Sequence, residues 1–203
     1  IGIISIGERW VQAVKIVITG AYSAGKTNFI RSISDIDPVS TEYEVTDYEE
    51  RELKHHTTVA LDFGKIEISD EVVLYLFGTP GQARFDFMWE VLSEGCVGYV
   101  VMVDSCRPAH FVETQNLLAR FATITDAPFV VAANKQDDPT ALPIGYIRRR
   151  LQLPFEVPVL PCIATERESV KNVLLTLLDH IDRSIPEETI EPPPEPTVDG
   201  MFL

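Results

Sequence analysis

The stretch "KIVITGAYSAGKT", residues 15–27, joins a short apolar run to a glycine-rich turn that ends in a lysine and a hydroxyl. Residues 20–27 match the pattern GxxxxGK[ST], which lies between a strand and a helix in phosphate-binding loops. Such a loop directs successive backbone N–H groups, together with a helix N-terminus, at the phosphates of a nucleotide. The stretch therefore predicts a nucleoside triphosphate site at the carboxyl end of a buried strand.

Two side chains of this loop have specific predicted tasks. Lys26 is expected to reach the β- and γ-phosphates, where it assists catalysis, and the Thr27 hydroxyl is expected to ligate Mg²⁺. The predicted nucleotide contacts are Gly20, Ala21, Tyr22, Ser23, Ala24, Gly25, Lys26, Thr27 and Asn28.

Outward from the loop, apolar runs alternate with segments of helical period. Strands are predicted at residues 15–20, 58–68, 72–78, 97–104, 129–135 and 157–163. Helices are predicted after Gly25, Gln82, Pro108, Pro143 and Glu168. The linker 69–71 is too short for a crossover, so the strands beside it must form an antiparallel hairpin. The pattern predicts an α/β fold: a six-stranded, mostly parallel sheet with one antiparallel strand, flanked by about five helices.

The chain as a whole fits one globular domain. It has 203 residues, 45% of them apolar, and a net charge of -14. We predict an N-terminal extension at 1–13, a nucleotide-binding domain at 14–182 and an acidic, proline-rich tail at 183–203. The negative charge disfavours nucleic acid or an anionic membrane as a partner.

The cysteines and the apolar runs bear on the compartment. The three cysteines lie singly in the sequence, which predicts small core residues rather than disulfides or a zinc site. No apolar run approaches the roughly 18 residues of a membrane span. We therefore expect a cytoplasmic protein without integral membrane association.

The segment "NKQD", residues 134–137, addresses the base of the nucleotide. A carboxylate such as that of Asp137 accepts two hydrogen bonds, from N1–H and the exocyclic amine of guanine, whereas adenine offers no such pair. Asn134 is expected to brace the ring edge and the phosphate loop, and the Lys135 stem to lie against the ring face. Together the two motifs predict a guanine nucleotide, GTP or GDP.

At these two sites the chain resembles the Ras-like small GTPases, over residues 14–182. It is most similar to bacterial members of the gliding-motility (MglA) type, through "FGTPGQ" at 77–82 and "TTVALDFG" at 57–64. The resemblance implies binding of GTP and Mg²⁺ and two switch loops that respond to the γ-phosphate. It also implies a GTP/GDP switch in bacterial signalling, polarity or motility, with protein regulators or effectors, of the small dimeric roadblock type among them, at the switch regions.

By position, the resemblance assigns four further residues. Thr58 would complete the Mg²⁺ coordination, Gly81 would offer its N–H to the γ-phosphate, and Gln82 would orient the attacking water. Ala164 would offer its backbone N–H to guanine O6, although its neighbours Ile163 and Thr165 depart from the family pattern.

Gly78 stands where the family carries an aspartate that holds a water of the metal. Asp62, four residues beyond Thr58 on the neighbouring predicted strand, is the candidate to replace it. The metal set is therefore Thr27, Thr58 and Asp62. The alternative is that Asp62 only caps the hairpin or pairs with Lys65.

Hydrolysis of GTP is expected to be slow without a partner. Gln82 supplies a water-positioning group, but Tyr22 stands where the family has a small residue beside that glutamine. Arg51 and Arg84 fall in predicted switch loops, either as internal arginine fingers or as exposed surface residues. A different interpretation is a constitutive GTP-binding scaffold or heterodimer subunit with vestigial hydrolysis.

Two further segments bear on the switch regions and on partner binding. The acidic stretch between Thr27 and Thr58 is long for a switch, which predicts a mobile loop. The segment "RFDFMWEVL", residues 84–92, places aromatic side chains either in the core or on an exposed patch for a partner.

Overall fold

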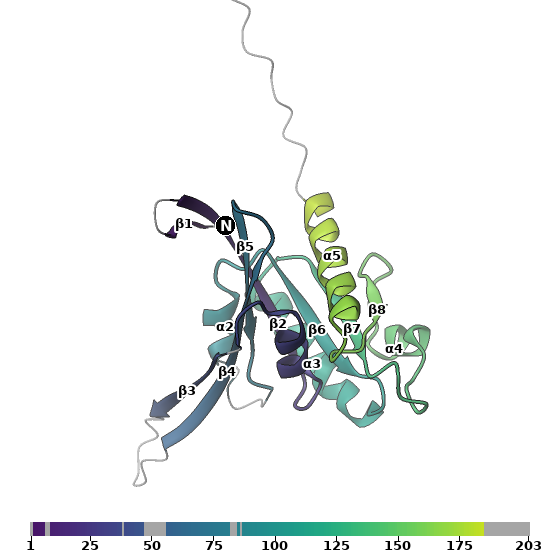
Figure 1. The fold of residues 1–203 in the computed structure, drawn as a ribbon. Coiled ribbons are helices and arrows are strands. Elements are labelled where there is room, and N and C mark those ends of the chain that lie inside the picture. Colours follow the sequence, from purple (N-terminus) through teal and green to yellow (C-terminus); the bar gives the residue numbers. More distant parts are fainter. Residues whose placement is uncertain are drawn as a thin grey trace, which may run out of the picture.

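The protein, analysed as a computed structural model, is described for residues 2–6, 9–37, 39–46, 56–81, 85 and 87–184. Within these ranges, eight strands form one sheet in the order β3-β4-β5-β2-β6-β7-β8, and β1 pairs with β2 (Figure 1). The strands are β1 (Gly2–Ile6), β2 (Arg9–Gly20), β3 (Val39–Thr46), β4 (His56–Glu67), β5 (Val72–Gly78), β6 (Gly98–Asp104), β7 (Phe129–Asn134) and β8 (Val159–Pro161).

The centre of the sheet is parallel. β2 pairs in parallel with both β5 and β6, and β6 continues through β7 to β8 in the same sense. All of β6 is buried, as expected for an apolar strand that is covered on both faces. The predicted hairpin is present: β4 and β5 are antiparallel, with Phe63 opposite Phe77.

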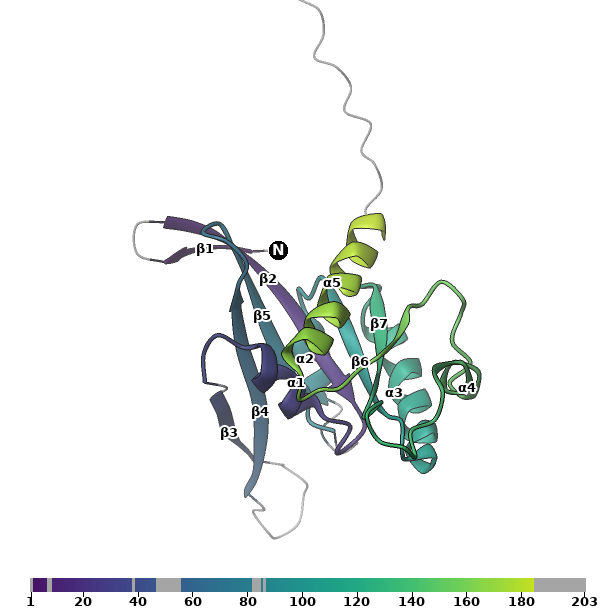
Figure 2. The ribbon, with the colours of Figure 1, turned by 45° about the vertical axis from the view of Figure 1, so that its right-hand side comes forward.

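Helices cover both faces of the sheet (Figures 1 and 2). They are α1 (Lys26–Ile33), α2 (Phe87–Ser93), α3 (Phe111–Ile124), α4 (Ile144–Arg150) and α5 (Arg167–Ser184), with a 3₁₀ turn η2 (Pro108–His110) before α3. Alternation along β6 separates two cores. Val100 and Met102 pack with α1 and α5, whereas Val101 and Val103 pack with α2, α3 and α4.

The predicted fold class is confirmed, with all six expected strands and five expected helices in place. Two described strands, β1 and β3, were not predicted. β3 lies in the acidic stretch that the sequence analysis expected to be a loop, and with β4 it forms an antiparallel ladder that extends beyond the helices (Figures 1 and 2). Residues 47–55 of that stretch lie outside the described ranges.

The two ends of the chain meet the sheet differently. β2 begins at Arg9 and pairs with β1, so the expected domain boundary at residue 14 falls inside a continuous strand. At the other end α5 closes at Ser184, and the tail beyond it is outside the described part of the chain.

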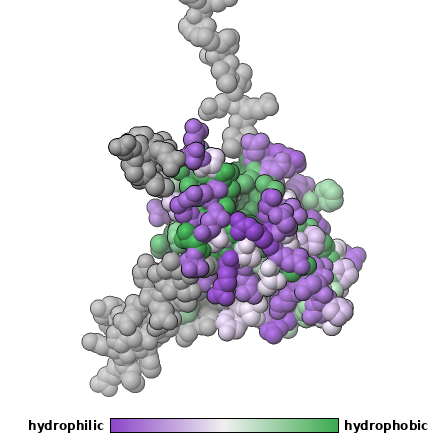
Figure 3. All heavy atoms as spheres, viewed as in Figure 1, coloured by the Kyte–Doolittle hydropathy of each residue, from purple (hydrophilic) through white to green (hydrophobic). Residues whose placement is uncertain are grey.

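The surface of the described molecule is mixed. Hydrophilic side chains cover most of the face in Figure 3, with small hydrophobic areas between them. Over the residues described, no helix combines the length and apolar character needed to cross a membrane.

The packing of α5 on the sheet gives a direct test of this core. Leu177 is fully buried, whereas Leu175, on the same helix, is 52% exposed. We expect Leu177→Ala to lower the free energy of unfolding by about 2–5 kcal/mol, because it leaves a cavity under α5. Leu175→Ala should change it by less than about 1 kcal/mol. Urea denaturation measures both, and equal effects would contradict the assigned helix face.

Candidate nucleotide-binding site

The phosphate-binding loop lies at the carboxyl end of β2, directly before α1. Gly25 has φ 106°, in the left-handed region that favours glycine. A Cβ on Gly25 would lie 2.2 Å from Nδ2 of Asn134. The glycine therefore permits both the turn and the close approach of the base-recognition loop.

Lys26 is buried in this loop although it carries a charge. Its Nζ donates to the carbonyl oxygens of Gly20 at 2.7 Å and Ala21 at 2.9 Å. Burial lowers the pKa of Lys26 to about 8, and the nearby Asp62 carboxylate opposes this shift. The ammonium group is thus held against the loop, in the position where a lysine meets phosphate oxygens.

Asn134, at the end of β7, connects the two ends of the predicted site. Its Nδ2 donates to the carbonyl oxygen of Ala24 at 2.8 Å, and its Oδ1 accepts from the N–H of Ala164 at 2.9 Å. The expected brace between Asn134 and the phosphate loop is therefore present.

The rest of the NKQD segment forms a turn in which Lys135 has φ 65°. Lys135 Nζ donates to the buried carboxylate of Asp104 at 2.6 Å. Asp138 accepts from the N–H and the hydroxyl of Thr140, and these hydrogen bonds lower the pKa of Asp138. Asp137 is exposed and makes no hydrogen bond or ion pair with the described residues. The turn thus leaves the Asp137 carboxylate available for a ligand.

Ala164 lies beside Asn134, and its N–H donates a hydrogen bond to Oδ1 of that side chain. This is the N–H that the sequence analysis assigned to guanine O6. Ile163 N–H donates to the Ser169 hydroxyl, and Glu166 N–H donates to the Ile163 carbonyl. Among these consecutive donors, Thr165 N–H makes no hydrogen bond with the described part of the chain.

The predicted metal residues Thr27 and Asp62 are brought together. The Thr27 hydroxyl donates to Oδ2 of Asp62 at 2.5 Å. Asp62 and Gly78 lie one residue beyond the last pair of β4 and β5, Phe63 opposite Phe77, and a Cβ on Gly78 would lie 3.0 Å from the Cβ of Asp62. Lys65 instead pairs with Glu67 at 2.6 Å. A carboxylate from β4 thus lies beside position 78 and beside the Thr27 hydroxyl.

This pair of oxygens suits Mg²⁺, which prefers oxygen ligands and keeps several waters. Thr58 lies on the same strand as Asp62, opposite Glu44, where the structure describes the backbone alone. No group of three or more His, Cys, Asp or Glu side chains within the described ranges is placed to hold a metal. A metal here would depend on hydroxyl, water and phosphate oxygens besides Asp62.

The residues after β5 approach the phosphate loop. A Cβ on Gly81 would lie 2.8 Å from Lys26 Nζ and 2.9 Å from the backbone nitrogen of Tyr22. Gln82, Arg51 and Arg84 lie outside the described residues. The Tyr22 side chain is 63% exposed. Gly81 is therefore at the expected place, beside the group that should meet the γ-phosphate.

The aromatic segment after Gly81 is divided between the core and the surface. Phe85 and Trp89 are buried, and Trp89 Nε1 donates to the Pro80 carbonyl at 3.3 Å. Phe87 and Val91, on the same helix, are exposed. Both alternatives of the sequence analysis thus apply to part of the segment.

Two residues of the site were not predicted. Asp104 ends β6 and is buried, and Arg107 follows three residues later with its Nη1 donating to the Ser23 hydroxyl at 3.3 Å. A charged residue at the end of the apolar run "VGYVVMV" was a signal for Asp104. Nothing in the sequence near Arg107 indicates a contact with a loop so far away along the chain.

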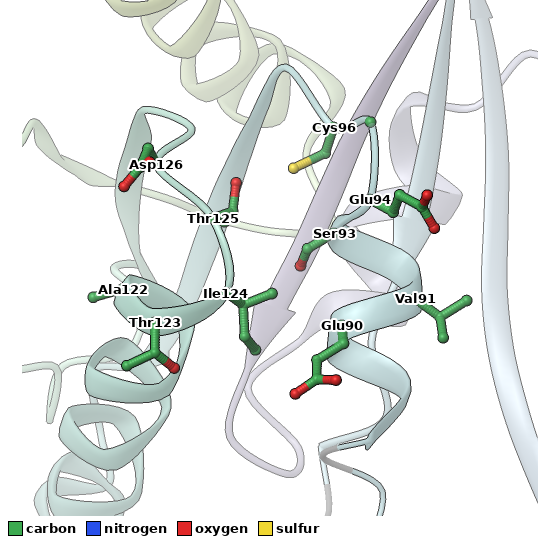
Figure 4. A pocket seen from close by; sticks show the side chains of 11 residues that line it. Glu90, Val91, Ser93, Glu94, Cys96, Ala122, Thr123, Ile124, Thr125 and Asp126 are labelled. Atoms are coloured by element: carbon green, nitrogen blue, oxygen red, sulfur yellow. The ribbon is translucent and has the colours of Figure 1, made fainter.

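A separate cavity of about 730 Å³ opens between the end of α2 and the connection from α3 to β7 (Figure 4). Its lining includes Glu90, Ser93, Cys96 and Asp126. These residues precede β6 and β7, so the cavity is at the amino ends of the parallel strands, opposite the phosphate loop. It is not part of the nucleotide site.

The chain is similar to known proteins. A family described as "conserved hypothetical ATP binding protein" matches residues 35–141, more than half of the chain. The chain belongs to this family. The matched range begins after the phosphate loop and includes Asp62, Gly78 and the NKQD turn.

Individual relatives extend the likeness. An uncharacterized protein of Methanocaldococcus jannaschii is 28% identical over 125 residues, 61% of this chain and 71% of the relative. ADP-ribosylation factor-like protein 4C of Homo sapiens is 27% identical over 164 residues, 77% of this chain and 78% of the relative. ADP-ribosylation factor-like protein 4D of Mus musculus is 26% identical over 147 residues, 69% of this chain and 66% of the relative. The chain is therefore a nucleotide-binding protein of the small GTPase-like, P-loop class.

The lowered pKa of Lys26 predicts that nucleotide affinity falls in alkaline solution. Phosphate binding needs the ammonium form, so above pH 8 a proton must be taken up as GDP binds. Affinity for GDP should be about tenfold weaker at pH 9 than at pH 7. Isothermal titration calorimetry measures it. Lys26→Met should bind weakly at both values with little pH dependence, and an equally steep fall in this variant would contradict the assignment.

Proposed function

We propose that this protein is a guanine-nucleotide switch that binds GTP and GDP with Mg²⁺ and hydrolyses GTP slowly. The proposal rests on the two hydrogen bonds of the Asn134 side chain, one to Ala24 and one to Ala164. These bonds fix the NKQD turn beside the phosphate loop. A ligand that fits here therefore has one part that binds the turn and another part that binds the phosphate loop. A nucleoside with phosphates is that ligand.

Asp137 favours guanine over adenine, although the family is described as ATP-binding. Its carboxylate accepts hydrogen bonds only, which suits the N1–H and exocyclic amine of guanine. Adenine would present an acceptor at N1 and leave the carboxylate poorly paired. The Thr165 N–H is our candidate donor to guanine O6, because Ala164 N–H is engaged by Asn134.

We assign the metal to Thr27, Asp62 and Thr58, with Asp62 in the role of the absent carboxylate at position 78. The 2.5 Å contact of Thr27 with Asp62 supports this choice, since hydroxyl and carboxylate oxygens are the donors that Mg²⁺ takes. When bound, Mg²⁺ would neutralise charge on the β- and γ-phosphates.

The chain's own groups account for slow hydrolysis. Lys26 would neutralise developing charge on the phosphates, Gly81 would offer its N–H to the γ-phosphate, and Gln82 would orient water. An arginine finger contributes a factor of about 10³ to 10⁵ in proteins that use one. Arg51 and Arg84 stay candidates for that role, beside a finger supplied by a partner.

Regulation would then act through protein partners at the switch regions. The exposed Phe87 and Val91 of α2 supply apolar surface next to the second switch. Roadblock-type regulators and a role in bacterial signalling, polarity or motility remain proposals from the MglA-type resemblance.

A second candidate is a constitutive GTP-binding scaffold or heterodimer subunit in which hydrolysis is vestigial. The exposed Tyr22 favours it, because this side chain leaves less room beside the γ-phosphate for a glutamine and an arginine. Retention of Gln82 favours the switch instead.

The choice of base is tested by Asp137→Asn. We expect the wild type to bind GTP more tightly than ATP, and the variant to lose roughly a hundredfold or more in GTP affinity, because two hydrogen bonds to a charged acceptor are lost. The variant should gain affinity for xanthosine triphosphate, whose C2 carbonyl accepts from the new amide. Competition binding with the three nucleotides measures this. Equal wild-type affinity for ATP and GTP would refute the guanine assignment.

The metal assignment is tested by moving the carboxylate between strands. Asp62→Gly should raise the Mg²⁺ concentration needed for half-maximal single-turnover hydrolysis about tenfold or more, and Asp62→Gly combined with Gly78→Asp should restore much of it. The exchange is geometrically matched because a Cβ on Gly78 would lie 3.0 Å from the Cβ of Asp62.

Gln82→Leu is the control for the same assay. It should slow hydrolysis at every Mg²⁺ concentration without shifting the half-maximal value, since it acts on water rather than on the metal. No hydrolysis by the wild type above buffer, with tight GTP binding retained, would replace the switch with the scaffold. A double variant no better than Asp62→Gly alone would refute the exchange.

A further inference from the structure

We propose that Arg107 binds the α- and β-phosphates of the nucleotide and slows its release. Arg107 lies beside the buried carboxylate of Asp104, whose closer charged partner is Lys135. This inference rests on the proposed function only in requiring that the phosphate loop binds a nucleotide, whatever its base.

The backbone places Arg107 beside the phosphate loop. β6 ends at Asp104, next to the end of β2 in the sheet. Arg107 N–H donates to the Asp104 carbonyl at 3.2 Å, and the Arg107 carbonyl accepts from His110 N–H at 3.0 Å. The turn is thus closed on both sides of Arg107, and its side chain projects from a defined position.

The guanidinium group lies against the loop itself. Its Nη1 donates to the hydroxyl of Ser23 at 3.3 Å, and Ser23 is in the middle of the loop. The N–H groups of this loop are those that cradle the α- and β-phosphates. A guanidinium beside Ser23 is therefore beside the diphosphate, and not only near the γ-phosphate.

Arg107 is the more distant of the two cationic partners of Asp104. The Asp104 side chain is only 1% exposed, so its charge needs close partners. Lys135 Nζ donates to its Oδ2 at 2.6 Å, and Cys106 N–H donates to its Oδ1 at 3.0 Å. Arg107 Nε lies farther away, at 3.6 Å from Oδ2. Asp104 therefore keeps its two shorter hydrogen bonds if the Arg107 guanidinium turns toward a phosphate.

The Arg107 guanidinium has further N–H donors besides the one that contacts Ser23. It carries five N–H groups, and the Arg107 side chain is 55% exposed. A phosphate oxygen is a stronger acceptor than the Ser23 hydroxyl, because the hydrogen bond then joins opposite charges. Small rotations of a long side chain suffice to exchange one acceptor for the other.

An arginine that binds the α- and β-phosphates differs from an arginine finger in the step that it affects, which is nucleotide release rather than cleavage. The α- and β-phosphates are common to GTP and GDP, so loss of Arg107 should speed the release of both. A finger acts on charge that develops during hydrolysis, so its loss would slow cleavage and leave GDP release unchanged.

The test compares dissociation rates of radiolabelled GDP and GTP from the full chain and three variants. Arg107→Ala should release both nucleotides about tenfold faster, and Arg107→Lys should fall between, since it keeps the charge but loses the planar fork. Arg120→Ala is the matched control, because Arg120 pairs with Glu90 on the surface at 2.5 Å. The control should release nucleotide at the wild-type rate.

Melting temperatures separate binding from folding. Arg107→Ala should melt like the wild type without nucleotide and show a smaller shift on adding GDP. Unchanged release of both nucleotides would overturn the proposal, as would an effect on GTP alone or slower hydrolysis with unchanged release. If the wild type prefers ATP, the guanine assignment fails, and the same comparison with ADP and ATP still decides the role of Arg107.

Discussion

The side chain of Asn134 is the contact on which the arrangement of the site depends. Its amide donates to the phosphate loop through Ala24 and accepts from the loop after β8 through Ala164. One buried amide thereby holds together three segments that are far apart in the chain: the phosphate loop, the end of β7 and the loop after β8. The amide offers a donor and an acceptor on one short side chain, and a carboxylate there would lose the bond to Ala24.

The topology explains why these segments meet. β2 is flanked by β5 on one side and β6 on the other, and α1, which follows β2, packs on the opposite face of the sheet from α2 and α3, which follow β5 and β6. Ligands of open α/β sheets bind in the crevice at such a point. The phosphate loop occupies the crevice, Asp62 and Gly81 approach from the β5 side, and Asp104 approaches from the β6 side. Each contributes charge or a backbone group to the same small volume.

Local patterns predicted most of the fold, because buried strands and amphipathic helices can be recognised from the spacing of apolar residues within short segments. β3 was missed because the sequence "VSTEYEVT" is polar, and its ladder with β4 is made by backbone pairing. In the site, the motifs at residues 20–27 and 134–137 were found from spacing alone. The proximity of Thr27 to Asp62 was anticipated only through a resemblance, and that of Ser23 to Arg107 was not anticipated. Contacts between distant segments depend on sheet order, which no local pattern contains.

Gly78 and Asp62 face each other across β5 and β4, and their exchange changes which loop is linked to the acidic group. A carboxylate at position 78 would lie at the root of the segment that leads to Gly81 and Gln82. At position 62 it lies instead on the strand of Thr58, four residues away. Any displacement of β4 therefore moves Thr58 and Asp62 together. Under the proposed function the two segments beside the phosphates are mechanically unequal: the first would carry the oxygen ligands Thr58 and Asp62, and the second would carry Gly81 and Gln82.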